Sequence, residues 1–415
     1  MIPEFIYLHG FASSPKTHKA IFLKNKLTEW GISLHIPDLN IPDFPSLTLT
    51  SMIARLAQEV EDCAPAPINI IASSLGALVA LHFVNRFKQT KASRVTRMLL
   101  LAPSLDFVQN RLQGMGKDAF DKWRAEGWSK FFHYSYNKEY KVNYELINDI
   151  IAYNSNRIQV DIPVLIYHGL RDNNVDCEQS IKFAENRNNI VLRLVDSDHT
   201  LVDQLDTIWS TAVRFFDLCA IYSTKQQNTV QIYNLANSTD VVRFKPYEDG
   251  FLNLLEAAYG NKLHGREVQL NRIYGRGHSY GAHCVFVAFS KDNKIDNLVG
   301  CSYIRPDGKR GATAVLPQYQ GRGIGRLLIC ASLKLFDKQF TEISPSDLRM
   351  KHLLTSIGFR AVASDSELKL NLGEAAHLLR SIRYQDHSII YTRSMKADQG
   401  VERELVMFTY HQESL

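Results

Sequence analysis

Five short apolar runs in the first half of the chain constrain its fold more than any other feature. They are residues 5–8, 68–71, 98–101, 164–167 and 190–194. Each run is apolar at every position or at all but one, which is typical of strands buried on both faces of a parallel sheet. Helical patterns separate the runs, one opening at Ser14-Pro15 and another covering residues 201–221. The alternation predicts an α/β fold with a doubly wound, mostly parallel sheet.

The length and the polar segments predict two domains. A chain of 415 residues exceeds what one hydrophobic core usually organises. We expect a first domain over residues 1–221, a polar linker over 222–240, and a second domain over 241–415. Between residues 104 and 157 the strand-like runs stop and large aromatic side chains gather. This segment is a cap over the carboxyl ends of the strands or a helical insertion with its own small core, and the two are compatible.

Charge and cysteine content exclude several classes of partner. The 48 basic and 43 acidic side chains are scattered, and the formal net charge is only +5. This balance favours neither nucleic acid nor an anionic membrane as a partner. The six cysteines lie far apart without a CxxC pair, so we expect a reduced compartment and no metal site. The amino terminus lacks the pattern of a signal peptide, and the apolar stretch 68–84 contains polar residues, so we expect a cytoplasmic protein without a membrane span.

Residues 72–76 combine a candidate nucleophile with a tight turn. The segment reads Ala-Ser-Ser-Leu-Gly and lies between a buried strand and an apolar helix. This is the context in which the G-x-S-x-G pattern presents a serine on strained backbone at a helix amino terminus. Small flanking residues are needed there, and Ala72 replaces the first glycine of the pattern. Ser74 is the predicted nucleophile; a serine at a helix start more often only caps the helix.

Further polar residues follow other predicted strands in the order that a Ser-Asp-His triad requires. His199 lies just after the strand 190–194 and is the predicted general base; Asp172 follows the strand 164–167 and would orient it. Asp176 is an alternative acid, but Asp172 is nearer the strand end. The loop that follows the first strand contains Phe11, whose N–H, with that of Leu75, would form an oxyanion hole.

Taken together, the segment Tyr7 to Lys16 and the motif around Ser74 resemble the small bacterial esterases of the YqiA type, which are α/β-hydrolases. The resemblance covers roughly the first half of the chain. It implies esterase or thioesterase activity on acyl substrates, with Ser74, Asp172 and His199 as the catalytic triad. The chain departs from the pattern at Ala72 and in the aromatic segment 104–157, so the resemblance does not extend to substrate preference.

The second half contains a glycine-rich turn between a strand and a helix. Residues 315–328 read VLPQYQGRGIGRLL. Glycines at 321, 323 and 325 allow the backbone N–H groups to approach an anion, and the helix amino terminus adds positive charge. The preceding runs 284–289 and 298–304 predict an antiparallel hairpin rather than a dinucleotide-binding βαβ unit. The pattern therefore favours a pyrophosphate site.

The spacing Gln320-x-x-Gly323-x-Gly325, with Gly358-Phe359 some thirty residues later, resembles the acetyl-CoA signature of GNAT N-acetyltransferases. The resemblance covers roughly residues 241–395 and implies an α+β GNAT fold, with acetyl-CoA as co-substrate and an amine as acceptor. The backbone around Val315 and Leu316 would pair with the pantetheine arm. The loop residues implied to bind the cofactor are Gln320, Gly321, Arg322, Gly323, Ile324, Gly325 and Arg326.

The catalytic groups of this second domain are not evident. The resemblance implies a tyrosine as general acid four residues before Gly358, where the chain has Leu354, which has no proton to donate. Glu342 and Ser344 are candidates for a base. Two interpretations therefore stay open: a bifunctional enzyme with hydrolase and acetyltransferase activities, or a hydrolase regulated by a non-catalytic acyl-CoA-binding domain. A hydrolase half that is only a scaffold is a third possibility, which the complete triad argues against.

Overall fold

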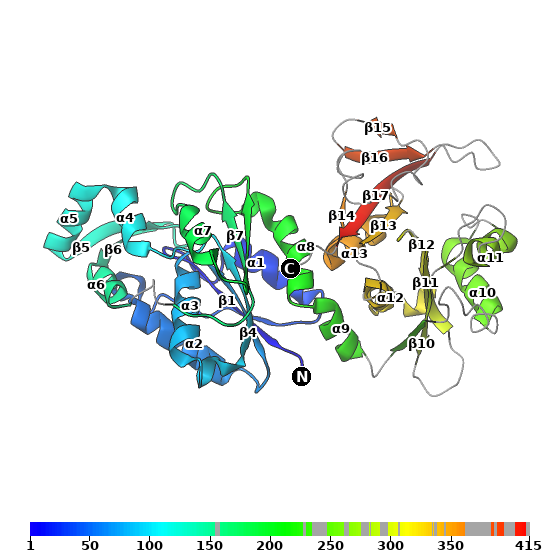
Figure 1. Ribbon diagram of the computed structural model, residues 1–415, viewed down its shortest axis with the longest axis horizontal. Coiled ribbons are helices and arrows are strands. Elements are labelled where there is room, and N and C mark those ends of the chain that lie inside the picture. The colour runs from blue at the N-terminus through cyan, green and yellow to red at the C-terminus, as the bar shows by residue number, and fades with distance from the viewer. Residues whose placement is uncertain are drawn as a thin grey trace. The chain divides into compact units, whose positions relative to one another are not determined.

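The computed structural model describes most of the first half of the chain and part of the second. The described residues are 1–153, 158–226, 230–234, 247–260, 265–274, 282, 284–290, 298–305, 308–333, 335, 338–343 and 346–361, with the backbone of 383–385, 388–393 and 403–411. The chain divides into two compact units, Met1–Phe216 and Asp217–Leu415 (Figure 1).

A six-stranded parallel sheet forms the centre of the first unit. Its strands are β1 (Glu4–Leu8), β2 (Leu34–His35), β3 (Ile68–Ser73), β4 (Val95–Leu101), β7 (Val164–Gly169) and β8 (Ile190–Val195). Their order is β2-β1-β3-β4-β7-β8, and every pairing is parallel. All residues of β3 and β7 are buried, as expected for strands covered on both faces. The five predicted strands and their parallel arrangement are confirmed; β2 was not predicted.

Helices cover both faces of this sheet. They are α1 (His18–Thr28), α2 (Leu49–Asp62), α3 (Leu75–Phe87), α7 (Glu178–Ala184) and α8 (Leu205–Phe215). Figure 1 shows α2 and α3 on one side of the strands and α1 and α8 on the other. The helix predicted from Ser14 begins only at His18, because the Thr17 side chain accepts the N–H of Ala20 and caps it there.

The segment between β4 and β7 is a mixed insertion that shares the core of the sheet. It contains α4 (Phe107–Met115), α5 (Lys117–Glu126), the antiparallel hairpin of β5 (Trp128–His133) and β6 (Lys138–Asn143), and α6 (Glu145–Ala152). Residues 154–157 of the predicted cap lie outside the described residues. The buried side chains of the insertion, Trp123 and Val142 among them, belong to the same hydrophobic cluster as β3 and α3. The alternative of a separate small core is therefore wrong.

The second unit consists of helices and antiparallel sheets. In chain order its elements are α9 (Leu218–Gln226), β9 (Val230–Asn234), α10 (Glu248–Tyr259), α11 (Arg266–Tyr274), β10 (Cys284–Ser290), β11 (Leu298–Ile304), β12 (Arg310–Val315), α12 (Ile324–Leu333), β13 (Lys338–Ile343), α13 (Leu348–Ile357), β14 (Arg360–Ala361), β15 (Arg383–Gln385), β16 (Ser388–Arg393) and β17 (Arg403–His411). One sheet has the order β12-β11-β10-β9. The other has the order β13-β17-β16-β15, and β14 pairs with β17 beside this path. The predicted hairpin is present as β10 and β11.

The predicted linker does not correspond to an unstructured connection. Of its residues, 222–226 complete α9 and 230–234 form β9, which pairs with β10. Residues 227–229 and 235–240 lie outside the described part of the chain. The units meet at Phe216 and Asp217, five residues before the predicted boundary at 221. Among the described helices, none combines the length and the hydropathy that a bilayer span needs.

Candidate active site

Ser74 lies in a strained turn between β3 and α3. Its backbone has φ 53° and ψ −120°, a conformation that costs free energy in any residue with a side chain. Its N–H donates to the carbonyl oxygen of Leu101 at 3.0 Å, which fixes the turn against β4. A Cβ at Gly76 would lie 2.6 Å from the carbonyl oxygens of both Leu8 and His9. Glycine is required there because α3 starts almost in contact with the end of β1.

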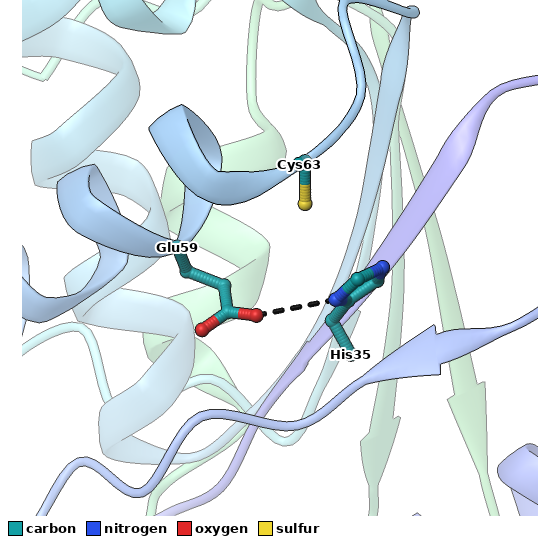
Figure 2. Close-up of side chains that lie close together, drawn as sticks. All are labelled: His35, Glu59 and Cys63. Atoms are coloured by element: carbon teal, nitrogen blue, oxygen red, sulfur yellow. Dashed lines mark hydrogen bonds and ion pairs between the residues drawn. The ribbon is translucent and has the colours of Figure 1, made fainter.

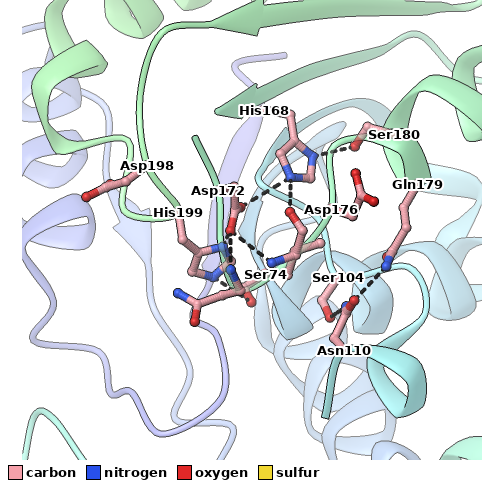
Figure 3. Close-up of polar contacts among 12 residues, drawn as sticks. Ser74, Ser104, Asn110, His168, Asp172, Asp176, Gln179, Ser180, Asp198 and His199 are labelled. Atoms are coloured by element: carbon pink, nitrogen blue, oxygen red, sulfur yellow. Dashed lines mark hydrogen bonds and ion pairs between the residues drawn. The ribbon is translucent and has the colours of Figure 1, made fainter. Parts of the chain in front are cut away.

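The structure brings the three predicted catalytic residues together. The His199 ring lies between the other two, with Nε2 3.2 Å from Ser74 Oγ and Nδ1 2.7 Å from Asp172 Oδ2 (Figure 3). Side-chain exposure is 20% for His199 and 0% for Asp172, so solvent reaches the base but not the acid. The alternative acid, Asp176, instead accepts the N–H of Glu178 near the start of α7. Parallel strands that end at one edge of a sheet account for this convergence.

Asp172 is held in its ionised form. Burial alone would raise its pKa, but hydrogen bonds from His168 and His199 outweigh burial and hold the pKa well below its usual range. The Oδ1 atom also accepts the N–H groups of Asn174 and Val175, each at 2.9 Å. A carboxylate with four donors around it is fixed in position as well as in charge.

His168 is a positioning residue that the sequence did not reveal. It is fully buried at the end of β7, and its Nε2 lies 3.1 Å from the carbonyl oxygen of Val175 and 3.2 Å from Asp172 Oδ2. Because both neighbours are acceptors, Nε2 carries the proton. Nδ1 then accepts from Ser180 Oγ at 2.7 Å. The available signal was a histidine inside an otherwise apolar strand, but only the fold shows which atoms face its nitrogens.

The loop after β1 is held against Ser74. A Cβ at Gly10 would lie 3.0 Å from the Cβ of Ser74, so the two backbones nearly touch. His9 Nδ1 lies 3.0 Å from the carbonyl oxygen of Gly10, which can only accept, so Nδ1–H donates to it; Nε2 faces the N–H of Leu39 at 3.0 Å and Asp38 Oδ1 at 3.3 Å. In a trans peptide the next N–H, that of Phe11, points away from that carbonyl. His9 therefore fixes the direction of the Phe11 N–H; Leu75, the other predicted donor, is the first residue of α3.

Aromatic side chains from the insertion and from the segment before α2 pack around this loop. The Phe11 ring lies 5.2 Å from Phe44, 5.5 Å from Phe107 and 5.2 Å from Phe131, measured between ring centroids. The hairpin is also tied to the loop directly, because the N–H of Tyr134 donates to the carbonyl oxygen of Ala12. The predicted cap thus reaches the segment that would form the oxyanion hole.

A second polar cluster lies at the opposite, amino end of β1. Figure 2 shows His35, Glu59 and Cys63, whose ligand atoms lie within 4.8 Å of one another. Both nitrogens of His35 face carboxylates, Glu59 Oε1 at 3.2 Å and Glu4 Oε2 at 3.3 Å, and the second oxygen of Glu59 accepts from Arg55 at 2.7 Å. Burial raises the pKa of the Cys63 thiol to about 11. We interpret the group as an ion-pair network with a protonated thiol beside it.

In the second unit, the glycine-rich loop leads into α12. Within the described part of the chain, the N–H groups of residues 321–325 donate to no acceptor. The first bond of the helix is from Leu327 N to the carbonyl oxygen of Gly323. Gly321 has φ +76° and nothing within 4 Å of the position of a Cβ. The arrangement presents several backbone donors at a helix amino terminus, which suits an anion.

Other predicted cofactor residues have partners within the protein. The carbonyl oxygen of Val315 accepts from Gln320 Nε2 at 3.1 Å, and Leu316 N donates to Val299 at 2.9 Å. A pantetheine arm that paired with Val315 would have to displace Gln320. The guanidinium of Arg326 is buried, stacks over the Tyr222 ring and donates to Ser356 Oγ, so its side chain turns inward.

The remaining loop residues have different surroundings. Arg322 is exposed and stacks over Tyr319, and Ile324 is buried at the start of α12. A Cβ at Gly323 would lie 1.7 Å from the Tyr222 hydroxyl oxygen, and one at Gly325 would lie 3.3 Å from Leu353.

The structure supplies no general acid at the position where the resemblance implied one. Leu354 lies in α13 and is 1% exposed, so it is a core residue. The Glu342 side chain and Ser344 lie outside the described part of the chain.

Comparisons with known proteins concern the first unit. The comparison with curated proteins gave no match. Among solved structures, a putative hydrolase from Agrobacterium vitis is 22% identical over 51% of this chain and 87% of its own, with a TM-score of 0.43. Alpha/beta hydrolase domain-containing protein 10 from mouse is 17% identical over 52% and 90%, with a TM-score of 0.42. Est1E from Butyrivibrio proteoclasticus is 16% identical over 54% and 87%, with a TM-score of 0.41.

The sheet order, the strained serine turn and the Ser-His-Asp arrangement identify the first unit as an α/β-hydrolase fold. The sequence profile of one family matches residues 4–216, more than half of the 415 residues. The match ends where the first unit ends, so the resemblance of the second half to GNAT enzymes stays a prediction. The chain belongs to the uncharacterised protein family UPF0227.

Proposed function

We propose that the first unit hydrolyses carboxylic esters or thioesters by transferring their acyl group to Ser74. The observation that carries this proposal is the continuous hydrogen-bond chain from Ser74 Oγ through His199 to the ionised carboxylate of Asp172. Each member follows a different strand and is fixed by contacts of its own, so the geometry does not depend on one flexible loop.

The reaction follows from these positions. His199 Nε2 accepts the proton of Ser74 as Oγ attacks the acyl carbon, and Asp172 stabilises the imidazolium without taking the proton. The N–H groups of Phe11 and Leu75 would stabilise the tetrahedral oxyanion. His199 returns the proton to the leaving alcohol or thiol. Water, activated by the same histidine, then releases the acid and restores the free serine.

A fluorophosphonate probe and a set of simple esters test this proposal. We expect the probe to label the wild-type protein once per chain and p-nitrophenyl acetate to be hydrolysed. Ser74→Ala should abolish both, whereas Ser73→Ala, a change at the neighbouring buried serine, should retain labelling. Labelling that persists in Ser74→Ala would disprove the assignment of the nucleophile.

For the second unit we propose acetyl-CoA binding at residues 321–326, followed by acetyl transfer to an amine. The N–H groups of residues 321–325, which have no acceptor among the described residues, and the positive φ of Gly321 favour this function over a purely structural turn. The alternative is an acyl-CoA-binding unit that regulates the hydrolase, and the buried Leu354 favours it. Turnover separates the two, because only a transferase releases CoA when amines are supplied.

Gly321 offers a matched pair of variants for the binding step. It lies in open space with φ +76°, a conformation that asparagine and aspartate tolerate better than other residues. Gly321→Asp places a carboxylate where the pyrophosphate would lie and should abolish CoA binding measured by calorimetry. In Gly321→Asn the new side chain has nearly the shape of aspartate without its charge, so this variant should retain most of the affinity for CoA. Equal affinities of the two variants would contradict a phosphate site at this loop.

A further inference from the structure

Arg111 combines a shielded guanidinium nitrogen with the lack of a charged partner among the described residues. It lies on α4, and its guanidinium carbon is 5.6 Å from the ring centroid of Phe11 and 5.3 Å from that of Phe107. Its Nε atom is shielded from solvent and has no hydrogen-bond partner, and no carboxylate of the described residues forms an ion pair with it. Burial lowers its pKa, which the nearby Tyr134 hydroxyl opposes.

Arg124, an arginine of the same insertion, shows the usual arrangement. Its guanidinium also stacks on aromatic rings, but it lies 3.7 Å from Asp121 and donates to the Tyr144 hydroxyl at 3.0 Å. Its side chain is 61% exposed, so water can bind the N–H groups that Asp121 and Tyr144 leave free. Arg111 is only partly exposed, and a shielded guanidinium nitrogen without a hydrogen-bond partner is costly unless a ligand supplies the acceptor.

Two connections place Arg111 next to the proposed catalytic serine. Through the aromatic side, it lies over Phe11, which directly follows the Gly10 backbone that touches Ser74. Through the helix, the preceding residue Asn110 donates to Ser104 Oγ at 2.8 Å, and Ser104 N donates to the carbonyl oxygen of Ser74 at 3.2 Å (Figure 3).

The helix is also fixed from the other side. Gln179 of α7 donates to Asn110 Oδ1 at 2.6 Å. The position of α4 relative to Ser74 is therefore fixed by two hydrogen bonds of Asn110, one to Ser104 and one to Gln179 of α7.

We infer that the substrate of the first unit is an ester or thioester that also carries a carboxylate, and that Arg111 binds this carboxylate while Ser74 attacks the acyl carbon. The inference rests on the proposed hydrolase function. A guanidinium presents a planar set of donors that fits a carboxylate with two hydrogen bonds. The rings of Phe11 and Phe107 lie beside the guanidinium, and apolar surroundings of this kind strengthen such a pair.

Matched pairs of esters test the inference in two arms. In the acyl arm, mono-p-nitrophenyl esters of dicarboxylic acids with two to six methylene groups are compared with p-nitrophenyl esters of fatty acids of equal chain length. In the alcohol arm, 4-carboxyphenyl acetate is compared with phenyl acetate. We expect the wild-type protein to prefer the charged member in one arm, through a lower KM. The arm and the chain length report where the carboxylate lies.

Arg111→Gln should reduce kcat/KM for the charged member by about tenfold or more beyond its effect on the neutral member. Arg111→Lys, which keeps the charge but loses the planar fork, should retain an intermediate preference. Arg124→Gln is the matched control and should leave the ratio of charged to neutral substrates unchanged. Thermal unfolding and fluorophosphonate labelling show whether each variant is folded.

The outcomes separate the inference from the function on which it rests. If the wild-type protein cleaves neutral esters through Ser74 but has no preference for the charged member at any length in either arm, the inference is wrong and the hydrolase stands. The inference is also wrong if Arg111→Gln lowers kcat/KM for the charged and the neutral ester of a pair by the same factor. If no ester is cleaved and the probe does not label Ser74, the proposed function itself is wrong. The wild-type comparison decides the matter even if Arg111→Gln does not fold.

Discussion

Replacing Asp172 by asparagine tests the site most directly, because the carboxylate is surrounded by donors alone. Its Oδ1 accepts the N–H groups of Asn174 and Val175, and its Oδ2 accepts from His199 Nδ1 and His168 Nε2. Asparagine has nearly the same shape, but one of its two terminal atoms is a donor. In either orientation of the amide, its NH2 group faces other hydrogen-bond donors.

The more favourable orientation keeps the amide oxygen on the two backbone N–H groups and turns the NH2 group toward His199. The NH2 group can bond to His199 Nδ1 only as a donor, so the ring proton moves to Nε2, which faces Ser74. A protonated Nε2 cannot accept the serine proton. A triad with the wrong histidine tautomer loses a factor of about 10⁴ in kcat. The donor left facing His168 costs a further ~1–3 kcal/mol of stability.

The assay compares kcat/KM for p-nitrophenyl acetate and the rate of fluorophosphonate labelling in Asp172→Asn and Asp176→Asn. Asp176→Asn is the matched control, since Asp176 is exposed and accepts only the N–H of Glu178, which asparagine can also accept. Its activity should equal that of the wild-type protein. An Asp172→Asn protein with more than a tenth of wild-type activity, or a large loss in Asp176→Asn, would refute the assignment of the acid.

Three further variants probe the surroundings of the site. His168→Phe removes a hydrogen bond that lowers the pKa of Asp172; the carboxylate should then protonate at higher pH, so the midpoint of acid unfolding should move to higher pH. Burial lowers the pKa of Lys19 to about 8, so the charged amine costs stability below that pH. Lys19→Met should raise the free energy of unfolding in urea at pH 7 by about 1–3 kcal/mol, and this gain should vanish above pH 10.5. Gly76→Ala should prevent stable folding because its Cβ meets two backbone oxygens at 2.6 Å, whereas Gly114→Ala, with nothing within 4 Å, should be neutral or stabilising by thermal unfolding.

The parallel sheet could be predicted because strands that are buried on both faces appear in the sequence as short runs of mainly apolar residues. Strand β3 has six consecutive buried residues, a run that is short for a helix and is followed directly by the turn at Ser74. The two-residue strand β2 leaves no such mark. The β5–β6 hairpin was missed because its strands lack the continuous apolar run by which the other strands were recognised; their residues alternate mainly between exposed and partly buried positions, as in a strand at the surface.

The triad could be predicted because each member has a local signal: a tight turn for Ser74, and polar residues at strand ends for Asp172 and His199. The residues that fix these groups have none. His9 and His168 act through the choice of ring nitrogen that faces a backbone atom, and that choice depends on chain segments about 30 and 7 residues away. Such roles follow from the fold and are not encoded in a motif.

The glycine-rich loop shows why a motif can be satisfied for more than one reason. Gly323 must be glycine in this structure whatever binds there, because any Cβ would overlap the Tyr222 hydroxyl. Gly321 has no such neighbour, so its positive φ and the donors beside it carry the argument for an anion. Variants can distinguish the packing requirement for glycine from the requirement that anion binding would impose. Gly323→Ala should destabilise the unit, and Tyr222→Phe in the same chain should restore part of its unfolding temperature, since the overlapping oxygen is gone while the φ of +78° still disfavours alanine. If the restored protein still binds CoA, Gly323 serves packing; if it folds but no longer binds, the close approach of backbone to pyrophosphate requires glycine at this position as well.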